Sequence, residues 1–213
     1  MPGSSLWLLP PPSHPLFPLL TSLIASTLPT HFPSLTSSPL LPKPEYFSPH
    51  MTLTSDISPS LYSTQDGDGA QAWLDSIPFP PSSKVKIRFG RINSQDVFWR
   101  RCFISVGYEG IRDVVAKARE YGAEGVGEKE KVEKWLEWWR AEFGGHVSLM
   151  YGDEEITDEV MKDIEKVVIG AGVKLPEIDS DKGEWDGWEG GVVWLVPTDG
   201  PIKDWKPIAT RTL

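Results

Sequence analysis

The chain has 213 residues, enough for one domain with a substantial core and too few for two independent domains of ordinary size. Its net charge of -9 argues against a long nucleic acid as partner, because such binding depends on basic side chains that release counterions. A single cysteine, Cys102, excludes an internal disulfide and gives no indication of an oxidising compartment. We therefore expect one intracellular domain over residues 1–213, and a monomer.

The first 50 residues are apolar and rich in proline, with Lys43 and Glu45 as their only charged side chains. No basic residue precedes Lys43 and prolines interrupt every apolar run, so we expect neither a signal peptide nor a membrane span. The pattern predicts a buried strand over 4–9 that prolines end. A helix is then predicted from Ser13 until Pro29, with apolar residues at helical spacing.

A half-buried strand is predicted at 50–54, where polar and apolar residues alternate. Asp66 and Asp68 resemble the start of a calcium loop, but the downstream ligands are missing and a plain turn is the better interpretation. Alternating strands at 84–92 and 97–106 predict a hairpin. Cys102 in the second strand has no neighbour that would activate it, so we expect a buried thiol.

The second half of the chain predicts two helices, a strand, a helix and a strand. The helices cover about 110–121, ending at Gly122, and about 128–143, and they are followed by a strand at 144–152. A helix from Thr157 to Gly170 and a strand over 190–197 come next. The tail from Pro201 onward is predicted to add an edge strand to the sheet.

A histidine followed two residues later by a hydroxyl residue occurs twice. His50 precedes Thr52 and His146 precedes Ser148, each on a predicted strand after a helix. Side chains alternate along a strand, so both members of each pair lie on one face. Two copies about half a chain length apart predict two similar lobes whose motifs face a shared cleft.

Paired histidines with hydroxyl partners suit acid and base catalysis on a phosphate ester. A neutral imidazole takes a proton from attacking water, a charged one protonates the leaving oxygen, and the hydroxyls bind nonbridging oxygens. Two histidines without a carboxylate or thiolate cluster are a poor ligand set, so we expect no metal and no cofactor. The alternative interpretation is that both histidines only pack in the core.

Four segments together resemble the 2H phosphoesterase superfamily, and in particular the fungal 2',3'-cyclic-nucleotide 3'-phosphodiesterases. They are Ser5–Pro10, Pro49–Ser55, Gly145–Gly152 and Gly190–Pro197. The likeness covers nearly the whole chain. The chain differs from the plant relatives, which carry disulfides that a single cysteine cannot form. We therefore do not expect the redox control of those relatives in this protein.

The resemblance implies an α+β fold: bilobal, with two mainly antiparallel sheets backed by helices and related by an approximate two-fold axis around a central cleft. It implies metal-independent hydrolysis of nucleoside 2',3'-cyclic phosphates to 2'-phosphates, and of ADP-ribose 1'',2''-cyclic phosphate in connection with tRNA splicing. His50 and His146 are then catalytic, with His146 as base and His50 as acid, and Thr52 and Ser148 bind phosphate.

The resemblance also suggests that Trp7 and Tyr151 contact the base or ribose, with core packing as the competing interpretation for Trp7. The implied partner is a small cyclic-phosphate nucleotide, in the cytoplasm or associated with the Golgi. Two other functions stay open: an RNA-end-processing 2H phosphodiesterase or ligase, and a nucleotide-binding module without catalysis. Turnover of a small cyclic phosphate, compared with binding alone, separates them.

Overall fold

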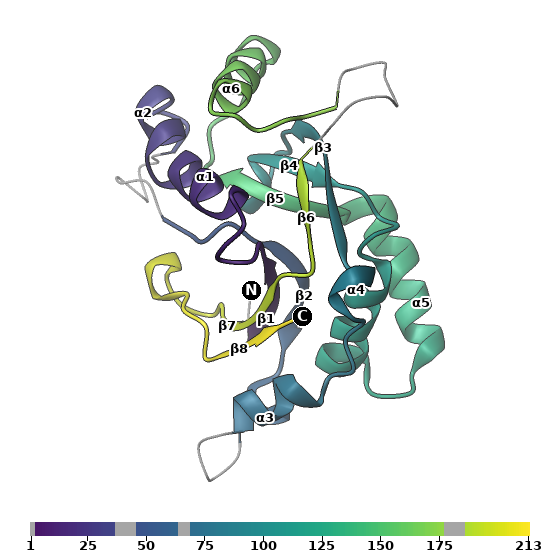
Figure 1. Ribbon diagram of the computed structural model, residues 1–213. Helices are drawn as coiled ribbons and strands as arrows, with labels where there is room; N and C mark the ends of the chain where they lie inside the picture. The colour runs from purple at the N-terminus through teal and green to yellow at the C-terminus, as the bar shows by residue number, and fades with distance from the viewer. Residues whose placement is uncertain (1–2, 37–45, 64–68, 177–185) are drawn as a thin grey trace.

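A computed structural model of the chain describes residues 3–36, 46–63, 69–176 and 186–213. Over these ranges the protein is α+β, with helices packed around a strongly curved antiparallel sheet (Figure 1). The strands are β1 (Ser4–Leu9), β2 (Met51–Ile57), β3 (Lys86–Asn93), β4 (Cys102–Val106), β5 (Gly145–Met150), β6 (Gly187–Glu189), β7 (Val192–Pro197) and β8 (Ala209–Thr212). The helices are α1 (Leu16–Ser22), α2 (Leu28–His31), α3 (Gly69–Ser76), α4 (Arg112–Arg119), α5 (Lys129–Trp138) and α6 (Asp158–Gly170).

The strands form one eight-stranded sheet, where the sequence predicted two. Their order is β6-β3-β4-β5-β2-β1-β7-β8. At the centre, Met51 of β2 pairs with Val147 of β5 and joins two four-stranded halves. Each half therefore contributes one histidine motif. The prediction failed on the number of sheets because an alternating pattern indicates which residues form strands but not which strand edges pair.

The apolar N-terminal segment is folded structure, as predicted. β1 is buried along its whole length and lies between β2 and β7. The helical segment that follows continues past Pro29, where it was expected to end, because a π-turn over Leu23–Thr27 precedes a new first turn. Proline is tolerated in a first turn, where its missing N–H would have no helical partner.

α4 and α5 form a helical hairpin, of which α4 and the π-turn that follows it pack against β2. The first helix was expected to end at Gly122, but its π-turn runs through Glu124 and it ends at Gly125, where φ is +101°. Gly122 has a packing role instead. A Cβ there would lie 3.1 Å from the side chain of Ile57, so glycine allows the helix to approach β2 closely.

The second strand of the predicted hairpin begins later than the sequence indicated. Phe98–Arg100 form a 3₁₀ turn, and β4 starts only at Cys102. The thiol of Cys102 is fully buried, as predicted, and this burial raises its pKa. The turn before β4 directs the side chain of Arg100 toward the site described below.

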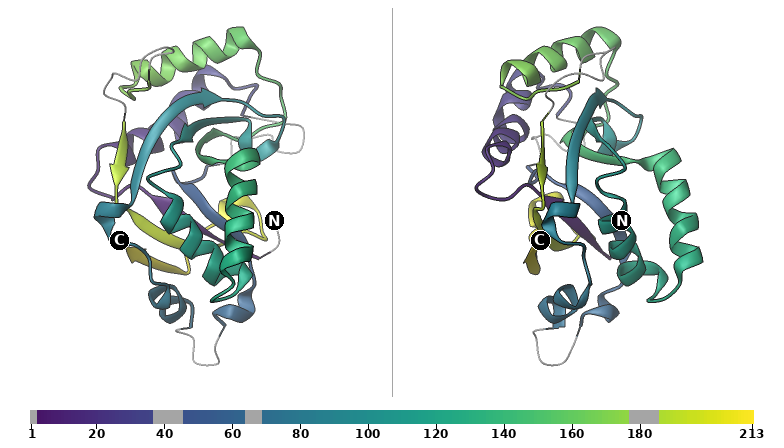
Figure 2. Two further views of the ribbon diagram at one scale, coloured as in Figure 1. Left: turned by 90° about the vertical axis from the view of Figure 1, so that its right-hand side faces the viewer. Right: turned by 45° about the vertical axis from the view of Figure 1, so that its right-hand side comes forward.

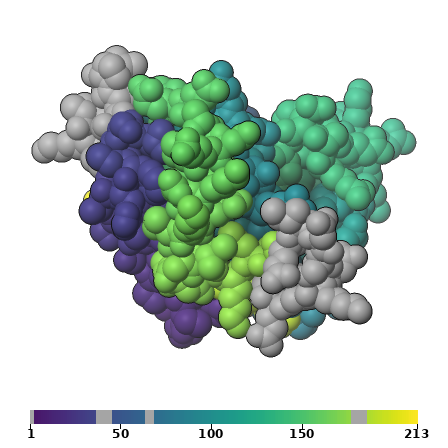
Figure 3. All heavy atoms as spheres, turned by 90° about the horizontal axis from the view of Figure 1, so that it is seen from above, coloured from purple at the N-terminus to yellow at the C-terminus, as the bar shows by residue number. Residues whose placement is uncertain are grey.

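The two edge strands of the sheet are β6 and β8, and α6 lies at one end of the molecule (Figure 2). α6 begins after the Thr157 cap, as predicted, and lies beside α1 and α2 at one end of the molecule (Figure 3). β8 is the edge strand predicted for the C-terminal tail, whereas β6 was missed because it has only three residues. Among the described residues, no helix is long and apolar enough to cross a membrane.

Candidate active site

The two motif strands are neighbours at the centre of the sheet, and their register brings the four motif residues together. The residue between His50 and Thr52 pairs with the residue between His146 and Ser148 in an antiparallel ladder. This register sets Thr52 across from His146 and His50 across from Ser148. The two histidines are then diagonal neighbours, about 7–8 Å apart at the backbone. All four line one cavity, so the predicted site residues do converge.

Each imidazole is held by the backbone carbonyl two residues before it. His50 Nδ1 lies 2.6 Å from the oxygen of Ser48, and His146 Nδ1 lies 3.2 Å from the oxygen of Gly144. A carbonyl oxygen only accepts, so Nδ1 donates in both rings and Nε2 is the reactive nitrogen. Gly144 has φ +65° at the end of the helical segment after α5, a conformation that favours glycine.

Burial keeps both imidazoles neutral near pH 7 when no anion is bound. It lowers the pKa of His50 to about 4, against the opposing effect of the Ser48 carbonyl. It lowers the pKa of His146 to about 3, with a further contribution from the positive charge of Arg100. Both rings therefore begin as bases, and an acid role for either one requires that a proton be gained with the substrate.

Trp7 and Tyr151, the predicted nucleoside contacts, are both nearly buried. The Trp7 ring stacks on the imidazole of His50, with centroids 3.7 Å apart and planes 12° from parallel. The Tyr151 ring stacks on Phe47 at 3.9 Å. Both rings also line the cavity. Contact with a nucleoside stays a prediction for them, whereas the stacking of Trp7 on His50 was not anticipated.

The two motif hydroxyls differ in their present partners. Ser148 is buried and its hydroxyl donates to the backbone oxygen of Trp99 at 3.0 Å. It must turn away from that carbonyl to donate to a phosphoryl oxygen. Thr52 is half-buried, lies opposite Trp7 in the β1–β2 register and lines the same cavity. Thr52 is thus the hydroxyl that can donate to a ligand without losing a contact seen here.

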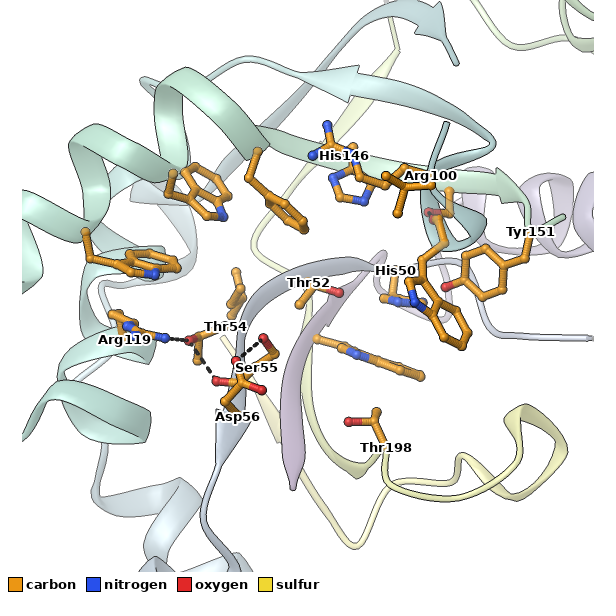
Figure 4. A pocket seen from close by; sticks show the side chains of 18 of the residues that line it. His50, Thr52, Thr54, Ser55, Asp56, Arg100, Arg119, His146, Tyr151 and Thr198 are labelled. Atoms are coloured by element: carbon orange, nitrogen blue, oxygen red, sulfur yellow. Dashed lines mark hydrogen bonds between the residues drawn. The ribbon is translucent and has the colours of Figure 1, made fainter. Parts of the chain in front are cut away.

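Sequence reasoning missed a buried arginine at the end of the cavity that holds the two histidines. Arg100 lines the cavity with the two histidines, and Figure 4 shows it beside His146. In the sequence it stands next to Arg101, which does not line this cavity. Two adjacent arginines in a loop give no indication of which one faces the site.

The cavity continues beyond Thr52 to a second end (Figure 4). There Arg119 lies against Thr54, and the Ser55 hydroxyl donates to the Asp56 carboxylate at 3.1 Å. Asp56 is the single non-glycine residue with positive φ among the described residues. The helical segment after α4 adds aromatic side chains to the cavity wall: Trp135, which lies against Arg119 at this end, Trp138 and Trp139, and also Phe143, which lies against His146.

Within the described ranges, no three or more His, Cys, Asp or Glu side chains gather as a group that could hold a metal ion. Asp66 and Asp68, the residues that resembled the start of a calcium loop, lie outside the described residues.

Known proteins with similar sequences belong to a class that acts on cyclic phosphodiesters, which agrees with the chemistry of this site. The family described as "Cyclic phosphodiesterase-like protein" matches residues 1–213. A 2',3'-cyclic-nucleotide 3'-phosphodiesterase of Neurospora crassa is 54% identical over 219 residues, and one of Phaeosphaeria nodorum is 39% identical over 215, with 100% of each chain covered. One of Yarrowia lipolytica is 25% identical, with 98% of this chain covered and 99% of its own.

An α+β chain with two histidine motifs in one cavity is a phosphoesterase of the 2H type. The chain belongs to the cyclic phosphodiesterase family, and it is an enzyme, a hydrolase of phosphodiester bonds.

Proposed function

We propose that the protein hydrolyses nucleoside 2',3'-cyclic phosphates to nucleoside 2'-phosphates through its two motif histidines. The observation that carries this proposal is the central register, which sets two buried imidazoles and two hydroxyls around one cavity. The names of the relatives support the same substrate class. A cyclic phosphate between diagonal imidazoles has room for water on one side and the leaving oxygen on the other, as in-line displacement requires.

In this mechanism Nε2 of one histidine takes a proton from water as the new P–O bond forms. Nε2 of the other histidine gives a proton to O3' as the P–O3' bond breaks. The proton count balances, and the enzyme regains its starting state when one proton moves between the two rings through solvent. Thr52 and Ser148 donate to the nonbridging oxygens.

The surroundings of the two rings support His146 as base and His50 as acid. The positive charge of Arg100 disfavours the cationic form of His146, so this ring stays unprotonated in the resting enzyme and its Nε2 is free to accept the proton of the attacking water. His50 is stacked on the indole of Trp7, and an aromatic face stabilises a cation lying against it. Trp7 is thereby assigned a role in holding and stabilising the His50 imidazolium.

The product should be a nucleoside 2'-phosphate. Hydrolysis in ¹⁸O-labelled water places one labelled oxygen in the phosphate of the 2' isomer, because water enters opposite O3'. Phosphorus NMR distinguishes the two isomers and reports the label. A 3'-phosphate would contradict the ribose orientation, binding without turnover would favour the noncatalytic nucleotide-binding module, and preference for RNA ends would favour the RNA-processing alternative.

Activity should survive removal of divalent metals. The imidazoles and hydroxyls supply a base, an acid and hydrogen-bond donors, so no step requires a Lewis acid. Turnover is measured before and after dialysis against EDTA, with a zinc-dependent phosphatase treated in parallel to verify that chelation is complete. Loss of activity that one added divalent ion restores would contradict the proposal.

The second end of the cavity supports a larger substrate as well. ADP-ribose 1'',2''-cyclic phosphate, implied by the resemblance, carries an adenosine diphosphate beyond the ribose that holds its cyclic phosphate. Trp138 is 52% exposed and lines this second end, and an exposed indole can stack on a purine for about 1–3 kcal/mol. We include this compound in the proposed substrate range.

A further inference from the structure

Arg100 is a buried cation for which the described residues provide no anion. Its side chain is only 7% exposed, and its Nε has no hydrogen-bond partner. None of the ion pairs among the described residues includes it. A buried charge without a partner is costly, so proteins rarely keep one unless a ligand supplies the opposite charge.

The neighbouring Arg101 shows how this protein treats an arginine whose role is structural. Arg101 is 4% exposed, but its guanidinium has both a carboxylate and backbone oxygens as partners. Its Nε donates to the oxygen of Gly152 at 3.1 Å, and its Nη2 donates to Asp96 at 2.8 Å and to the oxygen of Asp153 at 3.2 Å. Two adjacent arginines are equally buried, and the unsatisfied one lines the catalytic cavity.

Aromatic rings hold the Arg100 guanidinium in place beside His146. Its central carbon lies 4.5 Å from the ring centroid of Phe143 and 4.8 Å from that of Phe103. The same two rings flank His146, at 4.9 and 5.1 Å between centroids. Rings attract a cation without using its N–H groups, so these donors stay available to an anion.

The turn that carries Arg100 is also tied to the second histidine motif. The backbone oxygen of Trp99, the residue before it, accepts the hydrogen bond from the Ser148 hydroxyl. Through this bond the turn that carries Arg100 lies against the strand that carries His146 and Ser148, around the same part of the cavity.

We propose that Arg100 is a catalytic residue that binds a nonbridging phosphoryl oxygen and stabilises the negative charge that builds up on phosphorus in the transition state. The inference rests on the proposed function. No bond to Arg100 forms or breaks: water attacks phosphorus, O3' leaves, and the histidines move the protons. A preorganised cation in a water-poor cavity lowers the energy of such a transition state more than that of the singly charged substrate.

The test compares Arg100→Met with Arg100→Lys and with the matched control Arg101→Met. We expect Arg100→Met to lower kcat/KM about 10²- to 10³-fold, as loss of one transition-state donor does. Arg100→Lys keeps the charge and should retain more activity.

The thermal midpoint of Arg100→Met should equal or exceed that of the wild type, because an unpaired buried charge is removed. Arg101→Met should show the opposite pattern: a lower midpoint, with kcat/KM kept at temperatures where it is folded.

A second readout separates a catalytic role from a merely structural one. Arg100 lowers the pKa of His146, so its removal should move the acidic limb of the kcat/KM profile to higher pH. Unchanged kcat/KM, or an unchanged acidic limb, in folded Arg100→Met would overturn the proposal.

Binding of inorganic phosphate, measured by calorimetry, tests the role of Arg100 even if the proposed substrate is wrong. Wild-type protein that binds phosphate but does not hydrolyse nucleoside 2',3'-cyclic phosphates would refute the proposed function alone. We expect at least tenfold weaker phosphate binding in Arg100→Met than in the wild type, and unchanged binding in Arg101→Met. Equal affinity of Arg100→Met and wild-type protein for phosphate would refute the role of Arg100.

Discussion

Replacing either His50 or His146 with alanine is expected to lower kcat by about 10²- to 10⁴-fold, the usual contribution of a general acid or base. Both imidazoles line the same cavity, and among the described residues that line it there is no third histidine. Turnover of a nucleoside 2',3'-cyclic phosphate is the measurement, and circular dichroism verifies the fold. His31→Ala is the matched control, since His31 is exposed at the end of α2 and should keep wild-type activity.

The double variant of His50 and His146 makes this test sharper. Because the two rings serve one displacement, removing both should cost little more than the worse single change. Independent, multiplying losses would indicate that the rings do not act in one step. A single variant with near-normal kcat would remove that histidine from the mechanism.

The arrangement within each histidine motif was predictable because alternation along a strand is a local property. The pattern around His50 and His146 showed that each imidazole shares a face with its hydroxyl partner, and the structure places both pairs on adjacent strands. That adjacency comes from pairing between residues 96 positions apart, which no local pattern contains. The same limitation explains why one sheet was read as two.

The helix ends were mispredicted where tertiary packing decided the outcome. Glycine often ends a helix, so Gly122 was expected to do so. Its lack of a side chain instead allows close packing against Ile57, and the helical segment ends at Gly125. Pro29 likewise continues a helix because a π-turn precedes it. Glycine and proline mark positions with special backbone or packing requirements, and the sequence alone does not say which requirement applies.

The polar surroundings of the histidines were the least predictable part of the site. The stacking of Trp7 on His50 depends on bulges in the β1–β2 ladder, which shift the register between Leu6 and Trp7. The position of Arg100 depends on a 3₁₀ turn inside a segment that alternates like a strand. In the proposed mechanism these two features distinguish the acid from the base, so the sequence motif names the pair but not the roles within it.

Binding of the cyclic phosphate should be accompanied by uptake of a proton. The pKa of His50 is about 4 without a bound anion, so the ring is neutral at pH 6–7. A phosphate anion beside the ring favours its charged form and raises this pKa. Between the free and bound pKa values the complex holds more protons than the separate partners. Affinity should therefore increase as pH falls through the bound pKa, and level off below the free pKa.

The measurement uses a variant of low activity, so that the substrate itself can serve as ligand. His146→Gln should bind a nucleoside 2',3'-cyclic phosphate and hydrolyse it about 10²- to 10⁴-fold more slowly than the wild type. This diester does not titrate near neutral pH. Calorimetry in two buffers of different ionisation enthalpy gives the number of protons taken up, for which we expect a value approaching one at pH 6. The His50→Gln, His146→Gln double variant is the control and should take up none. Equal proton uptake by both variants would mean that the proton binds to a group other than His50. If His146→Gln bound the ligand without taking up a proton, His50 would stay uncharged and could not act as the acid.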